Sequence, residues 1–196
     1  MKGLTEALDD VTEELRIIEM HREKAISASR RIIRLSKNTI HDVHTDVDPQ
    51  EHLSSMRDEV TSLLESCDEP YTRTSGPVCD ALSEYAEAAI LVSLTEDGTI
   101  PDHRNLGIDA GSWLLGLADC LGELRRMVMI HLTTGDLQSA IGVFGMMEGI
   151  HEGLMLQDIP DAIIPLRRKQ DIARGIMERT RSDITTATVM DRGRKQ

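Results

Sequence analysis

An uninterrupted helical period at the start of the chain limits the fold more than any other feature of the sequence. No proline occurs between Leu4 and Val47, and no glycine follows Gly3 in this stretch. At about 1.5 Å per residue, a helix of this length extends roughly 60 Å, which is unusual in a globular domain. Such a helix needs partners along its whole length, so the sequence predicts a bundle of helices.

Two faces can be distinguished on this predicted helix. The apolar face has seven-residue spacing and comprises Ile26, Ile33, Ile40 and Val47, together with Ala25, Ala28, Ile32, Leu35 and Val43. Beside it runs a row of basic side chains, the cationic ridge, formed by Arg30, Arg34, Lys37, His41 and His44. At 100° per residue, these five positions fall within a sector of about 80°. The ridge is either a solvated face that forms ion pairs along the helix or a surface that contacts phosphate groups.

Composition places the chain among the all-α globular proteins. Its 196 residues suffice for one core and contain few alternating β-branched segments, so we predict a single helical domain over residues 1–188 and a flexible tail over 189–196. The formal charge of −12 argues against a nucleic-acid partner unless basic side chains are concentrated locally. Aromatic residues make up only 2% of the chain, which excludes a surface that holds single strands by base stacking.

The cysteines and the N-terminus indicate the compartment. Cys67, Cys79 and Cys120 are widely separated and odd in number, which is typical of reduced thiols rather than of disulfides or a zinc site. The N-terminal residues lack the apolar core of a signal peptide, and no segment approaches the roughly 20 apolar residues of a membrane span. We therefore expect a soluble cytoplasmic protein with no membrane partner.

Five further helices are predicted after the long one. The second begins at Asp48-Pro49, which supply an N-cap and a first-turn proline, and runs to about residue 67. The third begins at Gly76-Pro77 and has about 18 residues. Residues 96–107 are rich in turn formers and indicate a surface loop. The remaining helices are predicted over about 109–132, 136–156 and 160–185, which gives a bundle of six to seven helices.

Two of these helices carry acidic pairs among apolar neighbours. Glu84 and Glu87 stand three residues apart, so they share one face of the third helix. Asp119 and Glu123 stand four apart and share one face of the fourth. Because burial of unpaired charge is costly, either one or both pairs are exposed and face Arg125, Arg126 or basic residues from elsewhere, or the pairs bind a divalent cation together. Carboxylate oxygens are typical ligands of Mg²⁺, for which Mn²⁺ can substitute. An ion bound in this way activates a water molecule for attack on a phosphodiester.

Several motifs link this sequence to a known family. They are Glu84-Tyr85-Ala86-Glu87-Ala88, the segment Leu-Leu-Gly-Leu-Ala-Asp-Cys-Leu-Gly-Glu-Leu-Arg-Arg-Met over residues 114–127, and the following Gly135-Asp136. They resemble the translin family, and most closely its translin-associated factor X branch. The N-terminal segment from His21 to His44 also resembles the first helix of that family. The likeness extends over roughly residues 15–182, and the second motif is long and fairly specific.

The resemblance implies a translin-like helical fold that assembles into a hollow shell of roughly eight subunits and binds RNA or single-stranded DNA. For the factor X branch it also implies a Mg²⁺-dependent endoribonuclease that faces the cavity. The acids that match the motifs are Glu84, Glu87, Asp119 and Glu123, whereas Asp80 lies outside them and is a weak candidate. The long insertion of the animal pattern is missing, so a homo-oligomer and a hetero-oligomer with a translin-type subunit both remain open.

The predicted activity is cleavage of single-stranded or partly unpaired RNA with little sequence specificity, because backbone contacts rather than stacking would hold the substrate. An enclosed lumen lined by the cationic ridge would reconcile RNA binding with the acidic net charge. Two other functions remain open. One is a non-catalytic translin-like binder of single-stranded RNA or DNA in which the acids are structural. The other is an all-α nucleotide pyrophosphatase, whose usual Glu-Glu-x-x-Glu opening is missing here.

Overall fold

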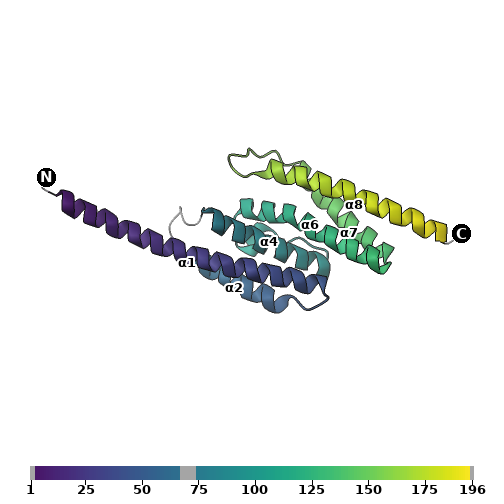
Figure 1. Ribbon diagram of the computed structural model, residues 1–196, viewed down its shortest axis with the longest axis horizontal. Coiled ribbons are helices and arrows are strands. Elements are labelled where there is room, and N and C mark those ends of the chain that lie inside the picture. Colours follow the sequence, from purple (N-terminus) through teal and green to yellow (C-terminus); the bar gives the residue numbers. More distant parts are fainter. Residues whose placement is uncertain (1–2, 67–73, 195–196) are drawn as a thin grey trace.

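The structure is a computed structural model that describes residues 3–66 and 74–194, and these residues fold into helices and connecting turns without a β-strand. The helices are α1 (Leu4–His44), α2 (Gln50–Ser66), α4 (Gly76–Glu96), α5 (His103–Leu106), α6 (Ala110–Thr134), α7 (Leu137–Met155) and α8 (Leu166–Arg194). They form the elongated bundle of Figure 1. This arrangement confirms the predicted all-α class and the very long N-terminal helix.

Helices α4 and α6 lie at the centre of the bundle and pack against each other. Helices α1 and α2 cover α4 on one side, while α7 and α8 cover α6 on the other (Figure 1). Large side chains that are fully buried join these layers, among them Tyr85, Ile90, Leu121 and Met147. Across the described ranges 3–66 and 74–194, no helix combines the length and the apolar character needed to cross a bilayer.

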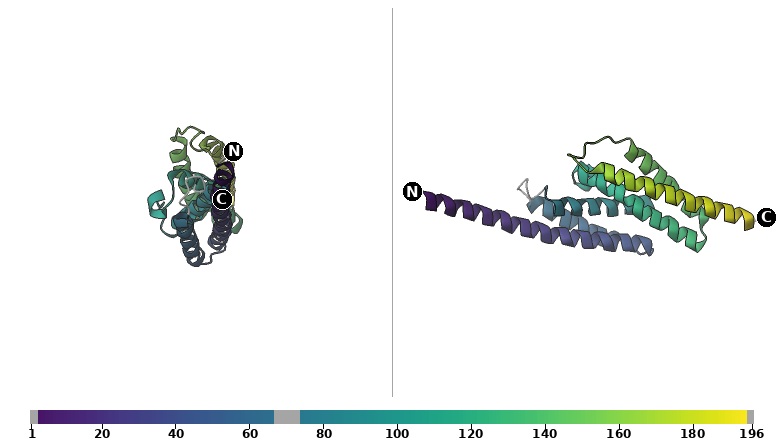
Figure 2. Two further views of the ribbon diagram at one scale, coloured as in Figure 1. Left: turned by 90° about the vertical axis from the view of Figure 1, so that its left-hand side faces the viewer. Right: turned by 45° about the horizontal axis from the view of Figure 1, so that its top comes forward.

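Helices α1 and α8 lie on the same side of the molecule and extend beyond the bundle at opposite ends. Figure 1 places the two termini at these opposite ends, and Figure 2 shows both helices from two further directions. Only the second half of α1 carries buried residues, from Ala25 to Asp42. The long helix predicted from the sequence is therefore packed along half of its length only.

The long helix ends three residues earlier than predicted. The prediction extended it to Val47, whereas α1 ends at His44. The Thr45 hydroxyl donates a hydrogen bond to the His41 carbonyl, and Asp46 has a left-handed φ of 57°, which a helix cannot continue. Val47 is consequently exposed and does not belong to the apolar face.

The loop and the C-terminal helix also differ from the prediction. The predicted surface loop over residues 96–107 contains the short helix α5, which Asp102 caps by accepting a hydrogen bond from the Asn105 amide. Helix α8 begins at Leu166 instead of near residue 160 because Pro165 disfavours helical geometry in the residue before it. The same helix continues to Arg194, past the start of the tail predicted over 189–196, and no proline interrupts this stretch.

Candidate functional site

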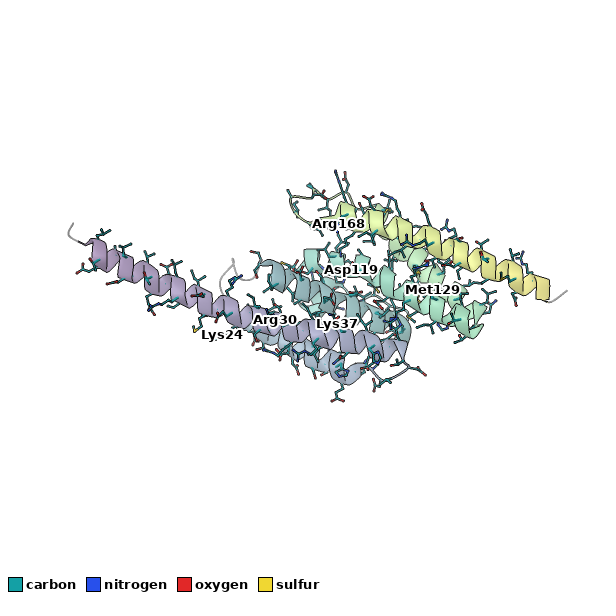
Figure 3. The ribbon with its side chains drawn as sticks, viewed as in Figure 1. Lys24, Arg30, Lys37, Asp119, Met129 and Arg168 are labelled. Carbon is teal, nitrogen blue, oxygen red and sulfur yellow. The ribbon has the colours of Figure 1, made fainter. Side chains whose placement is uncertain are left out.

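Four carboxylates from two central helices line one cavity of about 620 Å³. Its lining residues are Lys37, Ile40 and His41 from α1, Glu84 and Glu87 from α4, and Asp119, Glu123 and Arg126 from α6. Figure 3 labels two of them, Lys37 on α1 and Asp119 on α6. The structure therefore brings together the two acidic pairs that the sequence singles out, and it adds basic side chains to the wall of the same cavity.

A close contact between α4 and α6 explains how the two pairs meet. A Cβ atom on Gly116 would lie 2.4 Å from the Ser83 carbonyl oxygen and 2.8 Å from the Glu87 amide nitrogen. Only glycine allows the two backbones to approach this closely. Asp119 follows Gly116 by three residues, so its carboxylate lies on the same side of α6, next to Glu87.

Glu87 is the acid that this environment perturbs most strongly. Burial, and after it the negative charges of the other three acids, raise the pKa of Glu87 to about 8. The ammonium group of Lys169 acts in the opposite direction but does not compensate. Glu87 therefore keeps its proton at neutral pH, mainly because burial disfavours its charged form.

Glu123 has two basic partners. His44 places its Nε2 atom 2.6 Å from the Oε2 atom of Glu123, and Arg126 Nη1 lies 3.7 Å from the same oxygen. The hydrogen bond to His44 is the main cause that lowers the pKa of Glu123. The His44 side chain is only 1% exposed. His44 thus supports an acid of the cavity from behind, and it does not belong to the solvent-facing part of the cationic ridge.

Asp119 is paired with a residue from the C-terminal helix. The Nζ atom of Lys169 lies 2.5 Å and 2.7 Å from the two carboxylate oxygens of Asp119. The sequence analysis did not identify Lys169 as a site residue, because nothing local connects it to a helix 50 residues earlier. The available signal was the basic start of α8, where Lys169 follows Arg167 and Arg168.

Glu84 is held by a small residue on α1 that the sequence analysis also did not identify. The Ser36 hydroxyl lies 3.1 Å from the Glu84 carbonyl oxygen and 3.2 Å from its Oε2 atom. Ser36 is fully buried on the apolar side of α1. A hydroxyl at this position links the backbone of α4 to α1 and orients the Glu84 carboxylate.

The resemblance implies a divalent cation for this cavity. Within the part of the chain that the structure describes, no three His, Cys, Asp or Glu side chains are placed to hold a metal ion. The contacts give the reason, because Asp119 faces Lys169 and Glu123 faces His44. The donor set nevertheless fits Mg²⁺ in its chemistry, since it offers carboxylate oxygens from four side chains that line one cavity.

The remaining members of the cationic ridge face solvent on α1. Arg30, Arg34, Lys37 and His41 are exposed, and Figure 3 shows Arg30 and Lys37 along the same helix. Over residues 3–66 and 74–194 none of the four forms an ion pair within the chain. The charges of Arg30, Arg34 and Lys37 are therefore unpaired among the described residues, and Lys37 lines the cavity, which favours phosphate contact over the alternative of internally paired charges.

Asp80, the weak candidate, lies outside this arrangement. It is exposed and does not line the cavity, although it precedes Glu84 by one helical turn on α4. The described geometry therefore restricts the acidic site to the four residues that match the sequence motifs.

Comparison with known proteins gives one family and one fold. The sequence model of the Translin family matches residues 9–180. An uncharacterized protein of Methanocaldococcus jannaschii is 33% identical over 168 residues, which cover 84% of this chain and 75% of that protein.

Solved structures of similar chains have the same helical fold. The structure of AfC3PO in complex with duplex RNA is 29% identical with a TM-score of 0.81, and the match covers 94% of this chain and 97% of the other. AfC3PO alone is 30% identical with a TM-score of 0.81, covering 94% and 98%. The structure of apo-NeC3PO is 23% identical with a TM-score of 0.83, covering 95% and 98%, and supports the fold only.

Proposed function

Because this chain belongs to the translin family, we propose that it binds RNA and cleaves it as a Mg²⁺-dependent endoribonuclease. The proposed substrate is single-stranded or partly unpaired RNA, read with little sequence specificity. One observation carries the proposal, namely the cavity in which four carboxylates face basic side chains of α1. The 29% identical AfC3PO, solved with duplex RNA, supports RNA as the ligand.

The cationic ridge and the acidic side of the cavity would have complementary roles. Arg30, Arg34 and Lys37 would contact phosphate groups of the backbone, which position a nucleic acid without reading its sequence. His41 lines the cavity beside Lys37 and would offer an imidazole N–H donor to the phosphodiester at its edge.

The acidic side of the cavity would hold the metal ion. Glu84, Glu87, Asp119 and Glu123 are the proposed ligands of Mg²⁺, with Mn²⁺ as a substitute, and the bound ion would supply an activated water and charge neutralisation at the phosphodiester. Ser36, His44 and Lys169 orient three of these carboxylates before any substrate arrives. Glu87 holds a proton at neutral pH that it can release when positive charge enters the cavity.

Cleavage of a labelled RNA at increasing Mg²⁺ concentration, with EDTA as control, tests this function. Glu84→Gln and Asp119→Asn should abolish cleavage but leave RNA binding intact, because the ridge is unchanged. Asp80→Asn is the matched control on α4 and should cleave like the wild type. Cleavage that persists in both site variants, or in EDTA, would refute the metal site.

A non-catalytic binder is the second candidate function. It is favoured by the ion pairs that Asp119 and Glu123 already form with Lys169 and His44, because paired acids can be purely structural. Under this function, RNA binds with the same affinity in Mg²⁺ and in EDTA and stays intact in both. The pyrophosphatase alternative has no support in the family match.

Assembly into a hollow homo-oligomer of roughly eight subunits, or with a translin-type second subunit, is part of the same proposal. It would enclose the cavity and the ridge in one lumen. Single-stranded DNA is a further proposed ligand, because phosphate contacts do not require the 2′-hydroxyl. The described cysteines, Cys79 and Cys120, are free thiols, which agrees with a cytoplasmic location.

A further inference from the structure

The C-terminal ends of three helices meet around a second cavity, which we call the end pocket. It has a volume of about 630 Å³. Its lining comes from the end of α1 and the turn after it, between residues 43 and 49, from the end of α4 at Thr95 and Glu96, and from the last turns of α6 at Met127, Ile130 and His131. A helix C-terminus carries a partial negative charge, because its last carbonyl groups have no partner within the helix. The backbone alone therefore favours a positively charged occupant.

The side chains of the end pocket add to this negative charge. Among the described residues, its lining contains the carboxylates of Asp46, Asp48 and Glu96 and no lysine or arginine, and none of the three acids forms an ion pair. His131, which also lines the pocket, lies 3.9 Å from Asp136. The sequence explains the imbalance, because lysine and arginine are absent from residues 38–56, 77–103 and 127–166, the stretches that contribute to the lining. A pocket of this kind attracts cations.

A buried nitrogen atom at the same pocket lacks a hydrogen-bond partner. His44 lines the end pocket, and its side chain is only 1% exposed. Its Nε2 atom lies 2.6 Å from a carboxylate oxygen of Glu123, whereas its Nδ1 atom is buried and forms no hydrogen bond within the described part of the chain. An ionised carboxylate only accepts hydrogen bonds, so Nε2 carries the hydrogen and Nδ1 of the neutral ring is an acceptor. An occupant with an N–H donor would satisfy this atom.

The lining suits an extended organic cation better than a metal ion. Over residues 3–66 and 74–194, no three His, Cys, Asp or Glu side chains are placed to hold a metal ion. The lining also includes the apolar side chains Val43, Val47, Met127 and Ile130. A matching ligand therefore has several ammonium groups, which donate hydrogen bonds to carboxylates, and methylene groups between them, which cover apolar side chains.

An apolar groove of similar volume provides a comparison within the same molecule. It measures about 650 Å³, lies where α6 begins and is lined by apolar side chains that include Trp113, Leu117 and Ile163. Of the described residues that line it, Asp109 alone carries a carboxylate, which accepts a hydrogen bond from the Ser112 amide. The groove thus has the room for an organic cation but not the charge.

We propose that the end pocket binds an alkyl polyamine, a chain of methylene groups that joins two or more ammonium groups. The ammonium groups would pair with Asp46, Asp48 and Glu96, and one of them would donate a hydrogen bond to His44 Nδ1. Because the same ring supports Glu123 through Nε2, an occupied pocket would also hold His44 in place. Binding requires neither RNA nor Mg²⁺, so a failure of this proposal is distinct from a failure of the proposed function.

Titration calorimetry of the full chain with spermidine, in EDTA and without RNA, tests the site. One spermidine should bind per chain, and 1-aminobutane, which has a single ammonium group, should bind about tenfold more weakly. Asp46→Asn and Glu96→Gln should each weaken spermidine binding by about two- to fivefold, because each removes one partly exposed ion pair. Both changes suit the local structure. Asparagine tolerates the left-handed φ of 57° at residue 46, and a glutamine oxygen can still accept the hydrogen bond that Gln50 donates to Glu96.

Glu51→Gln and Asp97→Asn are the matched controls. Each removes the charge of a nearby exposed carboxylate that does not line the end pocket, so each should keep the wild-type affinity. Equal weakening in the controls would show that spermidine is attracted diffusely to an acidic chain and would overturn the proposal. Loss of binding in Glu84→Gln would also overturn it, because the polyamine would then occupy the cavity of the four acids.

Methyl NMR of the same chain locates the ligand. Spermidine should shift the methyl signals of Met127 and Ile130 in the end pocket and leave the signals of Ile163 in the apolar groove unchanged. Unshifted signals of Met127 and Ile130 at saturating spermidine would overturn the site, whatever affinity calorimetry gives.

Discussion

Glu87 couples the stability of the fold to pH through a single proton. Its pKa of about 8 lies above the ordinary value of 4.5, because burial and three neighbouring acids disfavour its charge. Between these two values, the folded state holds a proton that the unfolded chain has released. The proton therefore stabilises the fold at low pH, and this contribution is lost as pH rises through about 8.

The free energy of unfolding, measured by chemical denaturation in EDTA, should thus fall from pH 5 to pH 8. The part due to Glu87 is at most about 1.4 kcal/mol per pH unit. Glu87→Gln should remove this part, because its amide cannot ionise. Equal pH dependence in the variant and the wild type would contradict the pKa assigned to Glu87.

At the level of residues, the sequence predicts the four acids and one of their basic partners, Arg126, but not the partners that other helices supply. Helical spacing alone places Asp119 and Glu123 on one face of α6 and Glu84 and Glu87 on one face of α4, and the motif match supports both pairs. Lys169 and Ser36 reach these acids from α8 and α1, and such contacts depend on how helices pack. His44 shares the helix face of the ridge, yet the turn that ends α1 places it under Glu123 rather than in solvent.

At the scale of elements, one contact sets the distance between the helices that carry the acids. Gly116→Ala should destabilise the fold by about 1–3 kcal/mol, because its Cβ would meet backbone atoms of α4 at 2.4 Å and 2.8 Å. Thermal or chemical denaturation measures the loss, and Mg²⁺-dependent cleavage should weaken as α4 and α6 separate.

A second glycine on α6 supplies the control. Nothing lies within 4 Å of a Cβ at Gly122, so Gly122→Ala should stabilise the helix by up to about 1 kcal/mol. If both alanine variants behave alike, the close contact at Gly116 does not limit helix packing.

The sequence predicts most helices because their apolar periodicity and caps are local signals. It fails where the signal is weak or distributed. The short helix α5 has too few residues to show a period, and α8 lacks a stop signal near residue 185, so its end was predicted too early. The length of α1 is close to the prediction, but periodicity does not reveal that its buried residues, among those described, lie only between Ala25 and Asp42.

At the scale of the whole molecule, an acidic chain presents a local basic surface. Reversing the charge at Arg30, Arg34 and Lys37 to glutamate should weaken RNA binding and reduce its dependence on salt. Loss of three phosphate contacts would lower the slope of log affinity against log salt by about 2. Arg57→Glu on α2 is the control, because Arg57 is exposed but does not belong to the ridge. An unchanged slope in the triple variant would show that the ridge is a solvated helix face that makes no phosphate contacts.

The position of Trp113 gives the protein a built-in optical probe. It is the single tryptophan of the chain, it lines the apolar groove, and its Nε1 atom donates a hydrogen bond to the Pro101 carbonyl at 2.8 Å. Dilution that separates subunits should shift its emission to longer wavelength if a partner covers the groove, because water then reaches the indole ring. In the Ile163→Glu variant, the emission should already lie at the longer wavelength before dilution. The fluorescence of Trp113 would thus report the association of copies without a label.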